Sequence, residues 1–187
     1  MVRLDDLVDR LGDSVTVTWR SFLLRTEPKT PDRERFVAYT RSWLRPAELE
    51  PRATFRVWDS DDPPPRSSLP AQIAWKVLAR RRPDLERDFR RRLFSAYFAD
   101  NRDISDWGRL AEIAGEVGDD PDAFLHDANE HQLALAEEVV ADHRAAWERG
   151  ITAVPTVVLD DAVAVPGAQD TDTYEALVRR LLERRAS

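Results

Sequence analysis

The chain of 187 residues carries 28 Lys and Arg against 35 Asp and Glu, which gives a formal net charge of -7. The two signs are interspersed along the sequence, so the composition predicts a solvated globular surface and argues against a nucleic-acid partner. No apolar run has the length of a membrane span, which predicts a cytoplasmic protein without a membrane segment. The chain contains no cysteine, which excludes disulfide bonds, thiolate-bound metal and thiol catalysis within this polypeptide.

The N-terminal residues predict a helix followed by a strand. Apolar residues between Leu4 and Leu11 have helical spacing, and Gly12 follows them as a C-cap. In the segment 14–19, SVTVTW, apolar residues alternate with Thr, which predicts a half-buried strand.

The middle of the chain predicts helices only. A first helix is expected from Thr30 to Leu44, begun by the Thr30-Pro31 pair and ended by Pro46. The proline-rich stretch 47–68 predicts an ordered loop, held to the body of the protein by its apolar side chains. Further helices are predicted at 69–81, from Pro83 to Phe98, from Asp106 to Gly118, briefly after Asp120-Pro121, and from about Glu130 to Gly150.

The segment GITAVPTVVLDDAVAVPGAQ, residues 150–169, predicts a β-hairpin with a Val-Pro bond at its entrance. Residues on both sides of its Asp-Asp pair are β-branched, which is typical of strands. A final helix is predicted to follow, begun by Asp170 or Thr171. The predicted order is therefore helix, strand, a long helical block, two strands and a helix.

Three stretches resemble the DsbA-like branch of the thioredoxin superfamily: TVTWRSFLLR at 16–25, FSAYFADNRDISDWGRLAEIAGEVG at 94–118 and ERGITAVPTVVLDDAVAVPGAQ at 148–169. The stretch at 94–118 resembles the helix pair that FrnE-type proteins share with 2-hydroxychromene-2-carboxylate isomerases. The resemblance implies an α/β thioredoxin-like fold with a helical insertion domain. Residues 1–29 and 148–187 would form the thioredoxin-like part, and residues 30–147 would form the insertion.

The resemblance also implies a first strand and a Cys-x-x-Cys motif ahead of the first helix, and this sequence holds neither. In this fold the first strand is central, between the strands expected at Val15–Trp19 and Thr156–Leu159. We therefore expect these two strands to share a sheet without direct hydrogen bonds, separated by a slot about 9 to 10 Å wide. This interpretation favours an N-terminally truncated gene model over a natural protein that has lost the strand. In both cases open sheet edges remain through which the chain can associate with itself.

The candidate binding residues are Ala153, Val154, Pro155 and Thr156. In members of the family this loop holds a cis proline and faces the cysteine pair, which leaves its backbone free to pair with a peptide or thiol ligand. The resemblance therefore implies a cis Val154-Pro155 bond and a thiol or peptide substrate in this groove. A purely structural role, in which the loop sets the angle at which the strand begins, is the alternative. Catalytic residues, metal ligands and a cofactor are not predicted.

Two other groups of side chains could suggest a metal site. His126 and Glu130 lie four residues apart, as do Asp127 and His131, but a helix boundary is predicted between them, so no shared face is assured. The acids of segment 59–62 lack the glycine and the glutamate of a calcium-binding loop. Both groups are interpreted as exposed polar residues.

Three functions remain open from the sequence. The first is membership of the thiol-disulfide oxidoreductases, without activity in this chain because exchange requires a thiolate. The second is kinship with glutathione-dependent isomerases or transferases, in which Ser replaces the nucleophile and glutathione supplies the thiol. The third is a non-catalytic binding protein that uses the cis-proline groove.

Overall fold

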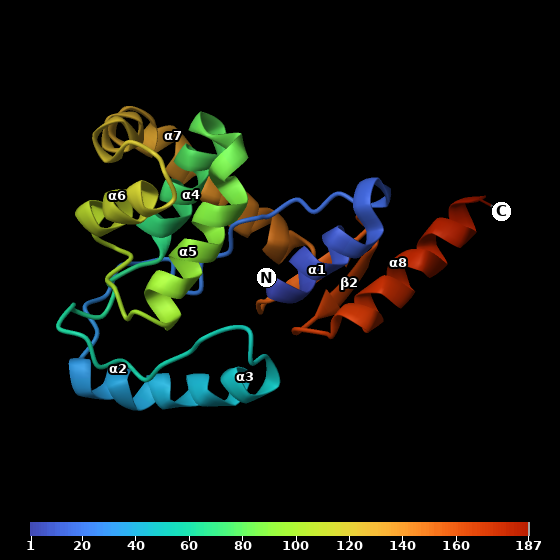
Figure 1. Ribbon diagram of the computed structural model, residues 1–187, viewed down its shortest axis with the longest axis horizontal. Coiled ribbons are helices and arrows are strands. Elements are labelled where there is room, and N and C mark those ends of the chain that lie inside the picture. The colour runs from blue at the N-terminus through green and yellow to red at the C-terminus, as the bar shows by residue number, and fades with distance from the viewer. Residues whose placement is uncertain (187) are drawn as a thin grey trace. The chain divides into compact units, whose positions relative to one another are not determined.

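The computed structural model describes residues 1–186, which separate into two compact units (Figure 1). Unit 1 comprises Met1–Phe22 together with Asp142–Ser187, and unit 2 comprises Leu23–Ala141. The domain boundaries expected from the sequence, at residues 29/30 and 147/148, differ from this division by several residues and stay a prediction.

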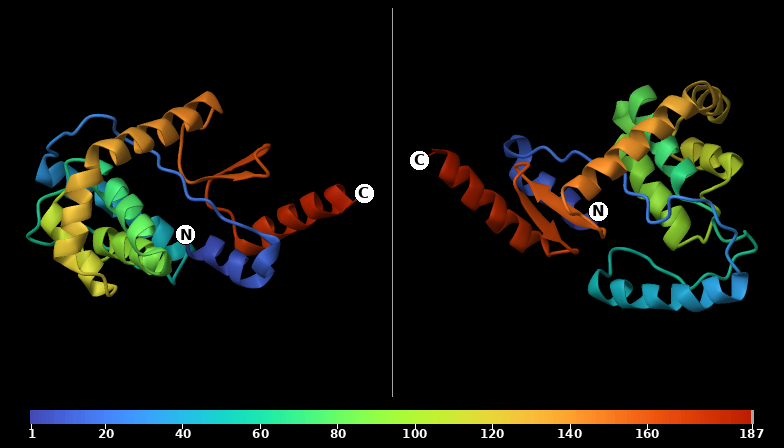
Figure 2. Two further views of the ribbon diagram at one scale, coloured as in Figure 1. Left: turned by 90° about the horizontal axis from the view of Figure 1, so that it is seen from above. Right: turned by 180° about the vertical axis from the view of Figure 1, so that it is seen from behind.

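The described part of unit 1 combines an antiparallel hairpin with two helices that pack against each other (Figure 2). The register of the hairpin places Val157 opposite Val165. Because side chains on a strand alternate between faces, Val157 and Leu159 point to the same side, where they pack with Leu7 and Tyr174. The elements of this unit are α1 (Val2–Leu11), β1 (Thr156–Leu159), β2 (Val163–Pro166) and α8 (Thr171–Ala186).

Local chemistry accounts for the ends of these elements. Gly12 ends α1 with a φ of 52°, a conformation that glycine adopts without steric cost. Asp160 and Asp161 have φ values of 55° and 53°, as a type I′ turn between two strands requires. Asp170 caps α8, because its carboxylate accepts a hydrogen bond from the backbone N–H of Thr173 at 2.7 Å.

The strand predicted at Val15–Trp19 is not formed. Residues 15–20 belong to no helix or strand, and the sheet of the described chain contains β1 and β2 alone. Val15 still packs against the core of unit 1, so the alternating pattern correctly predicted partial burial. A strand, however, also needs a hydrogen-bonded neighbour, and sequence alternation does not supply one. In the described chain β1 pairs with β2 and not with this segment, as expected, and the slot between the two segments stays a prediction.

The described part of unit 2 is helical around a large apolar core, and its last helix continues into unit 1. Pro70 lies in the first turn of the helix at 69–81, where its missing N–H is not needed, and this helix has the predicted bounds. The helices are α2 (Arg33–Thr40), α3 (Leu44–Leu49), α4 (Leu69–Arg81), α5 (Glu86–Phe98), α6 (Trp107–Glu116) and α7 (Pro121–Glu148).

The first helix of unit 2 differs from its prediction at both ends. It begins after Asp32, whose side chain accepts a hydrogen bond from Arg35 N–H, and not at Thr30. A 3-10 turn at Arg41–Trp43 then starts a new helix, α3, so Pro46 lies in a first turn instead of ending the segment. A proline is tolerated there because the N–H that it lacks has no helical partner.

The long helix was also predicted wrongly, as two helices with a break near Glu130. The structure has a single helix, α7, begun by Asp120, whose carboxylate accepts hydrogen bonds from the N–H groups of Asp122 and Ala123. Its buried residues keep helical spacing through the expected break, and an exposed Asn costs a helix little. The buried residues are Phe124, Ala128, Leu135 and Val139.

The proline-rich stretch is ordered, as predicted, and Trp58 is its anchor. The Trp58 side chain is buried, and the backbone N–H of Trp58 donates to Thr40 Oγ1 at 3.0 Å. Beside it, Asn101 Oδ1 accepts a hydrogen bond from the N–H of Asp59 at 3.1 Å. The stretch is therefore fixed to α2 and to the residues after α5.

Candidate functional site

The site predicted from the sequence is an exposed loop directly before β1. The Val154-Pro155 peptide bond is cis, as the resemblance implied. Thr156 Oγ1 donates to the carbonyl oxygen of Ala153 at 2.8 Å, and Gly167 N–H donates to the carbonyl oxygen of Pro155 at 2.8 Å. These bonds close the loop on itself and tie it to the end of β2.

Both backbone hydrogen-bonding groups of Val154 are available to a ligand. Its residue surface is 44% exposed, and within residues 1–186 its N–H and C=O have no hydrogen-bond partner. In the same described part of the chain, β1 pairs with β2 on one edge and with no strand on the other. The loop and the free edge of β1 thus present successive backbone groups that an added peptide could use.

The bend after β2 is held by a residue that the sequence analysis did not place at the site. The buried Tyr174 hydroxyl donates to the carbonyl oxygen of Gly167 and accepts from the N–H of Gln169, both at 3.2 Å. Arg3 of α1 donates to the carbonyl oxygens of Ala168 and Gln169. Tyr174 is the first apolar residue of the last helix, so its sequence position indicates burial but does not reveal the hydrogen bonds to the bend.

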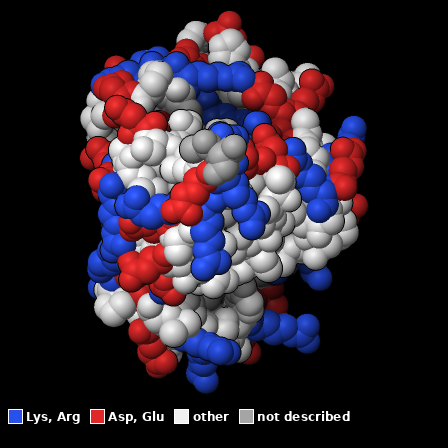
Figure 3. All heavy atoms as spheres, turned by 90° about the vertical axis from the view of Figure 1, so that its right-hand side faces the viewer, with Lys and Arg blue, Asp and Glu red and all other residues white. Residues whose placement is uncertain are grey.

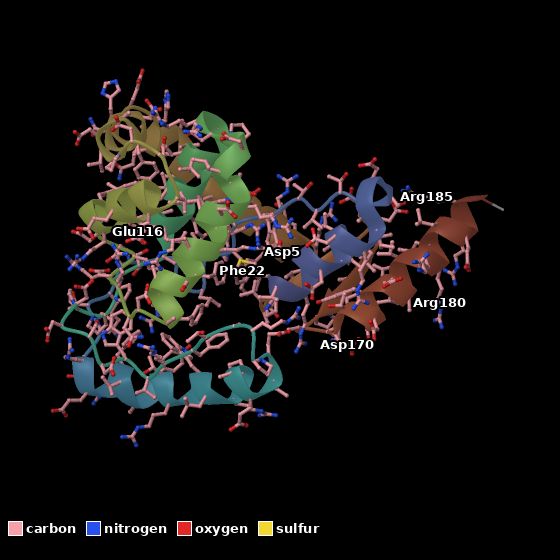
Figure 4. All side chains as sticks on the ribbon, viewed as in Figure 1. Asp5, Phe22, Glu116, Asp170, Arg180 and Arg185 are labelled. Atoms are coloured by element: carbon pink, nitrogen blue, oxygen red, sulfur yellow. The ribbon has the colours of Figure 1, made fainter. Side chains whose placement is uncertain are left out.

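The loop Ala153–Thr156 contains no charged side chain. Asp170 stands at the start of α8, whereas Arg180 and Arg185 project from later turns (Figure 4). The hydrogen bond from Thr173 N–H lowers the pKa of the Asp170 carboxyl. On the face drawn in Figure 3, acidic and basic side chains are interspersed, in agreement with the sequence pattern. None of the four loop residues has a titratable side chain, so the loop can bind a ligand but cannot transfer a proton.

The histidine cluster on α7 is a correction to the sequence analysis. Because α7 is continuous, His126 and Glu130 do share a face, with 3.9 Å between Nε2 and Oε2. Asp127 approaches both, but its carboxylate already accepts a hydrogen bond from Arg81 at 2.8 Å. The exposed histidine and its neighbours therefore fit a solvated helix surface better than a metal centre.

The acids of segment 59–62 are partly structural. Asp62 pairs with Arg109 at 2.8 Å and accepts a hydrogen bond from the N–H of Asp103 at 3.0 Å. These bonds fix the loop to the start of α6.

The part of the chain that the structure describes has no helix with the length and hydropathy of a membrane span.

Comparison with known proteins identifies the family. The family of DSBA-like thioredoxin domains matches residues 2–179. This chain belongs to that family. The order of elements, with a helical block between α1 and a hairpin that follows a cis proline, therefore represents a thioredoxin-like α/β fold with a helical insertion, as predicted.

Individual relatives are distant in sequence. The uncharacterized protein YwbO of Bacillus subtilis is 25% identical over 168 residues, which cover 89% of this chain and 82% of that protein. The crystal structure of a probable DsbA oxidoreductase from Streptomyces coelicolor has a TM-score of 0.75 at 25% identity, covering 95% of this chain and 81% of the other. The cytosolic disulfide reductase DsbM from Pseudomonas aeruginosa, solved with GSH, has a TM-score of 0.71 at 18% identity, covers 98% of this chain and 90% of its own, and is similar in fold.

Proposed function

We propose that this protein binds an extended peptide or a thiol ligand at the loop Ala153–Thr156 and does not itself catalyse thiol-disulfide exchange. The observation that carries the proposal is the combination of an exposed cis-proline loop with a sequence that has no cysteine. The parent activity of the family is oxidoreductase chemistry, and this chain keeps the part of the site that contacts a ligand.

The chemical argument concerns the sulfur atom that exchange requires. In exchange a thiolate attacks one sulfur of a disulfide, a mixed disulfide forms and the other sulfur leaves as a thiolate. The hydroxyl of Thr156 cannot replace this thiolate, because attack by oxygen forms no mixed disulfide, and an alkoxide is not formed at neutral pH without a strong base. No residue of the loop Ala153–Thr156 supplies such a base.

The structural argument concerns the free backbone of the loop. An extended peptide could pair with the N–H and C=O of Val154 and continue along the open edge of β1, as in strand addition to other sheets. The same edge would serve a second copy of the chain, so self-association belongs to this proposal. We also propose a cytoplasmic location, which fits a chain whose chemistry needs no disulfide bonds.

The test is a pair of variants at one residue. Val154→Pro removes the N–H donor, whereas Val154→Ala removes only side-chain atoms and keeps the backbone groups. We expect calorimetric titration with an extended Val-Thr pentapeptide or with glutathione to show saturable binding by the natural chain. Binding should persist in Val154→Ala and weaken about tenfold in Val154→Pro. Circular dichroism of both variants checks that the fold is kept.

Glutathione-dependent chemistry is the second candidate, favoured by the same lack of cysteine, because an external thiol could then supply the sulfur. Saturable binding of glutathione without binding of the peptide would support this function. Turnover of a disulfide substrate by the purified chain alone would contradict the proposal. Binding of neither probe would also contradict it.

A further inference from the structure

The helix α7 carries an apolar stripe that the described residues leave exposed. Leu133, Val140 and Trp147 are 77%, 41% and 53% exposed. They follow one another at intervals of seven residues, which is just under two helical turns, so the periodicity of this continuous helix places them on one side. The buried Leu135 and Val139 point to a different side. This stretch of α7 therefore has two apolar sides, one packed in the core and one in solvent.

The regular spacing separates this stripe from scattered surface residues. Single exposed apolar side chains are common and need no explanation, whereas a repeat of seven residues is the pattern by which one helix packs along another. Ala136 lies beside Leu133 and Val140, and its short side chain would let a second helix approach closely. The Trp147 ring has a fixed neighbour in His143, with 6.2 Å between the ring centroids. The stripe therefore fits a helix as its partner.

Two charged side chains border the same side of α7. Glu137 and Arg144 are exposed, and they too lie seven residues apart. Within residues 1–186 neither has an opposite charge within 4.0 Å. Seven residues correspond to about 10 Å along a helix, so the two side chains are too far apart to pair with each other. A partner that carries both signs at the matching distance would compensate both charges.

The order of these residues is symmetric about Val140. Leu133 lies seven residues before it and Trp147 seven residues after it, while Glu137 lies three before and Arg144 four after. A second α7 that crosses antiparallel at Val140 would therefore place its Trp147 against Leu133 and its Arg144 against Glu137. Because a two-fold axis repeats each contact, both charge pairs would form at once.

A parallel pair would lack this match. It would bring Glu137 to the level of Glu137 and Arg144 to the level of Arg144, and like charges that face each other oppose association. The stripe is therefore complementary to itself in the antiparallel direction, in apolar contacts and in charge.

We propose that this protein forms an antiparallel homodimer through α7, with Val140 at the two-fold axis and Glu137 of each copy paired with Arg144 of the other. This interface is separate from the free edge of β1 and requires no peptide ligand. One pair of helices buries a small area, and interfaces below about 1,200 Å² are typical of weak complexes, so we expect a dissociation constant in the micromolar range.

The experiment is sedimentation equilibrium of the natural chain and its charge variants over a range of protein concentrations. The natural chain should show a reversible equilibrium between monomer and dimer. Glu137→Arg and Arg144→Glu should each weaken the dimer about tenfold, because each change places like charges opposite each other. The double variant Glu137→Arg/Arg144→Glu should regain the affinity of the natural chain, since every pair again has opposite signs.

Further variants control for the position of the change. Glu34→Arg reverses an exposed glutamate on α2 and should leave the dimer unchanged. Val140→Glu should abolish the dimer, because two carboxylates would meet at the axis. Circular dichroism of each variant checks that the fold is kept.

Three results would overturn the proposal. They are a natural chain that stays monomeric, a dimer that persists in Val140→Glu, and a double variant that does not regain affinity. A dimer that persists would indicate association elsewhere, such as at the edge of β1. Peptide binding at Val154 is measured separately and does not depend on the outcome, because none of these variants alters the loop Ala153–Thr156.

Discussion

The two units differ in the size of their buried apolar core and in whether backbone hydrogen-bonding groups are left unpaired. The described part of unit 2 has a large core that includes the fully buried Phe89, Phe124 and Leu135, whereas the apolar core of described unit 1 has four buried residues, Leu7, Leu159, Tyr174 and Val178. The sheet of unit 1, in the described chain, has two strands and one free edge, and an isolated hairpin is marginally stable in water. Unit 2 can therefore supply most of the stability, while unit 1 presents unpaired backbone groups to a partner.

The largest effect is expected from a cavity in the core of unit 2. Phe89→Ala should reduce the free energy of unfolding by about 3 to 5 kcal/mol, because a fully buried ring is lost. Urea titration followed by circular dichroism measures this value. Leu133→Ala is the matched control: Leu133 is exposed on α7, so its removal should change stability by no more than about 0.5 kcal/mol. Comparable losses from the two variants would contradict the assignment of the core.

A smaller loss is expected from Asn101→Ala in the loop after α5. Asn101 is buried, its Oδ1 accepts from Asp59 N–H, and its φ of 54° is unfavourable for alanine. The change should cost about 1 to 3 kcal/mol and speed amide hydrogen exchange around Asp59. Asn129→Ala is the control, because Asn129 is exposed on α7, and it should leave amide exchange around Asp59 unchanged. Unaltered exchange in Asn101→Ala would show that this side chain does not hold the proline-rich stretch.

In unit 1, Tyr174→Phe tests whether the bend after β2 supports the loop. The ring stays, but the hydroxyl bonds to Gly167 and Gln169 are lost, at about 1 kcal/mol each. We expect lower stability of unit 1 and weaker peptide binding at Ala153–Thr156. Calorimetry that shows an unchanged peptide affinity, in a variant with a lower melting temperature, would show that the bend stabilises unit 1 but does not support peptide binding.

The smallest effect concerns the pH dependence of unit 2. Burial would raise the pKa of the Glu116 carboxyl, but hydrogen bonds from Arg102 and Arg92 outweigh it and lower the pKa below 4.5. A lowered folded-state pKa contributes stability above the unfolded pKa, and that stability is lost as pH falls through the folded value. Glu116→Gln should therefore lose less stability at pH 3 than at pH 7, and the loss at pH 7 should be less than about 1 kcal/mol because the pair is partly exposed. An identical loss at both pH values would contradict this account.

Local patterns in the sequence predicted most elements. The bounds of α4, the hairpin and the caps at Gly12, Asp106 and Asp170 depend on neighbouring residues, so they could be predicted. The segment Val15–Trp19 has the pattern of a strand, but strand formation depends on a distant partner, which the described chain does not provide.

The functional residues also differ in whether a contiguous stretch of sequence could place them. The loop at Val154-Pro155 could be placed from a contiguous motif that resembles a family. The hydrogen-bonding role of Tyr174 could not be placed in this way, because it appears only when the bend lies over its hydroxyl.

The most direct test of the account is amide hydrogen exchange of unit 1 with and without the extended Val-Thr pentapeptide. In the free protein we expect fast exchange at Val154 and at those amides of β1 that do not pair with β2, because these groups have no partner in the described chain. Saturating peptide should slow exchange at these residues and leave the core of unit 2 unchanged. Protection that is already present without a ligand, or exchange that the peptide does not alter, would contradict a peptide-binding edge next to the cis proline.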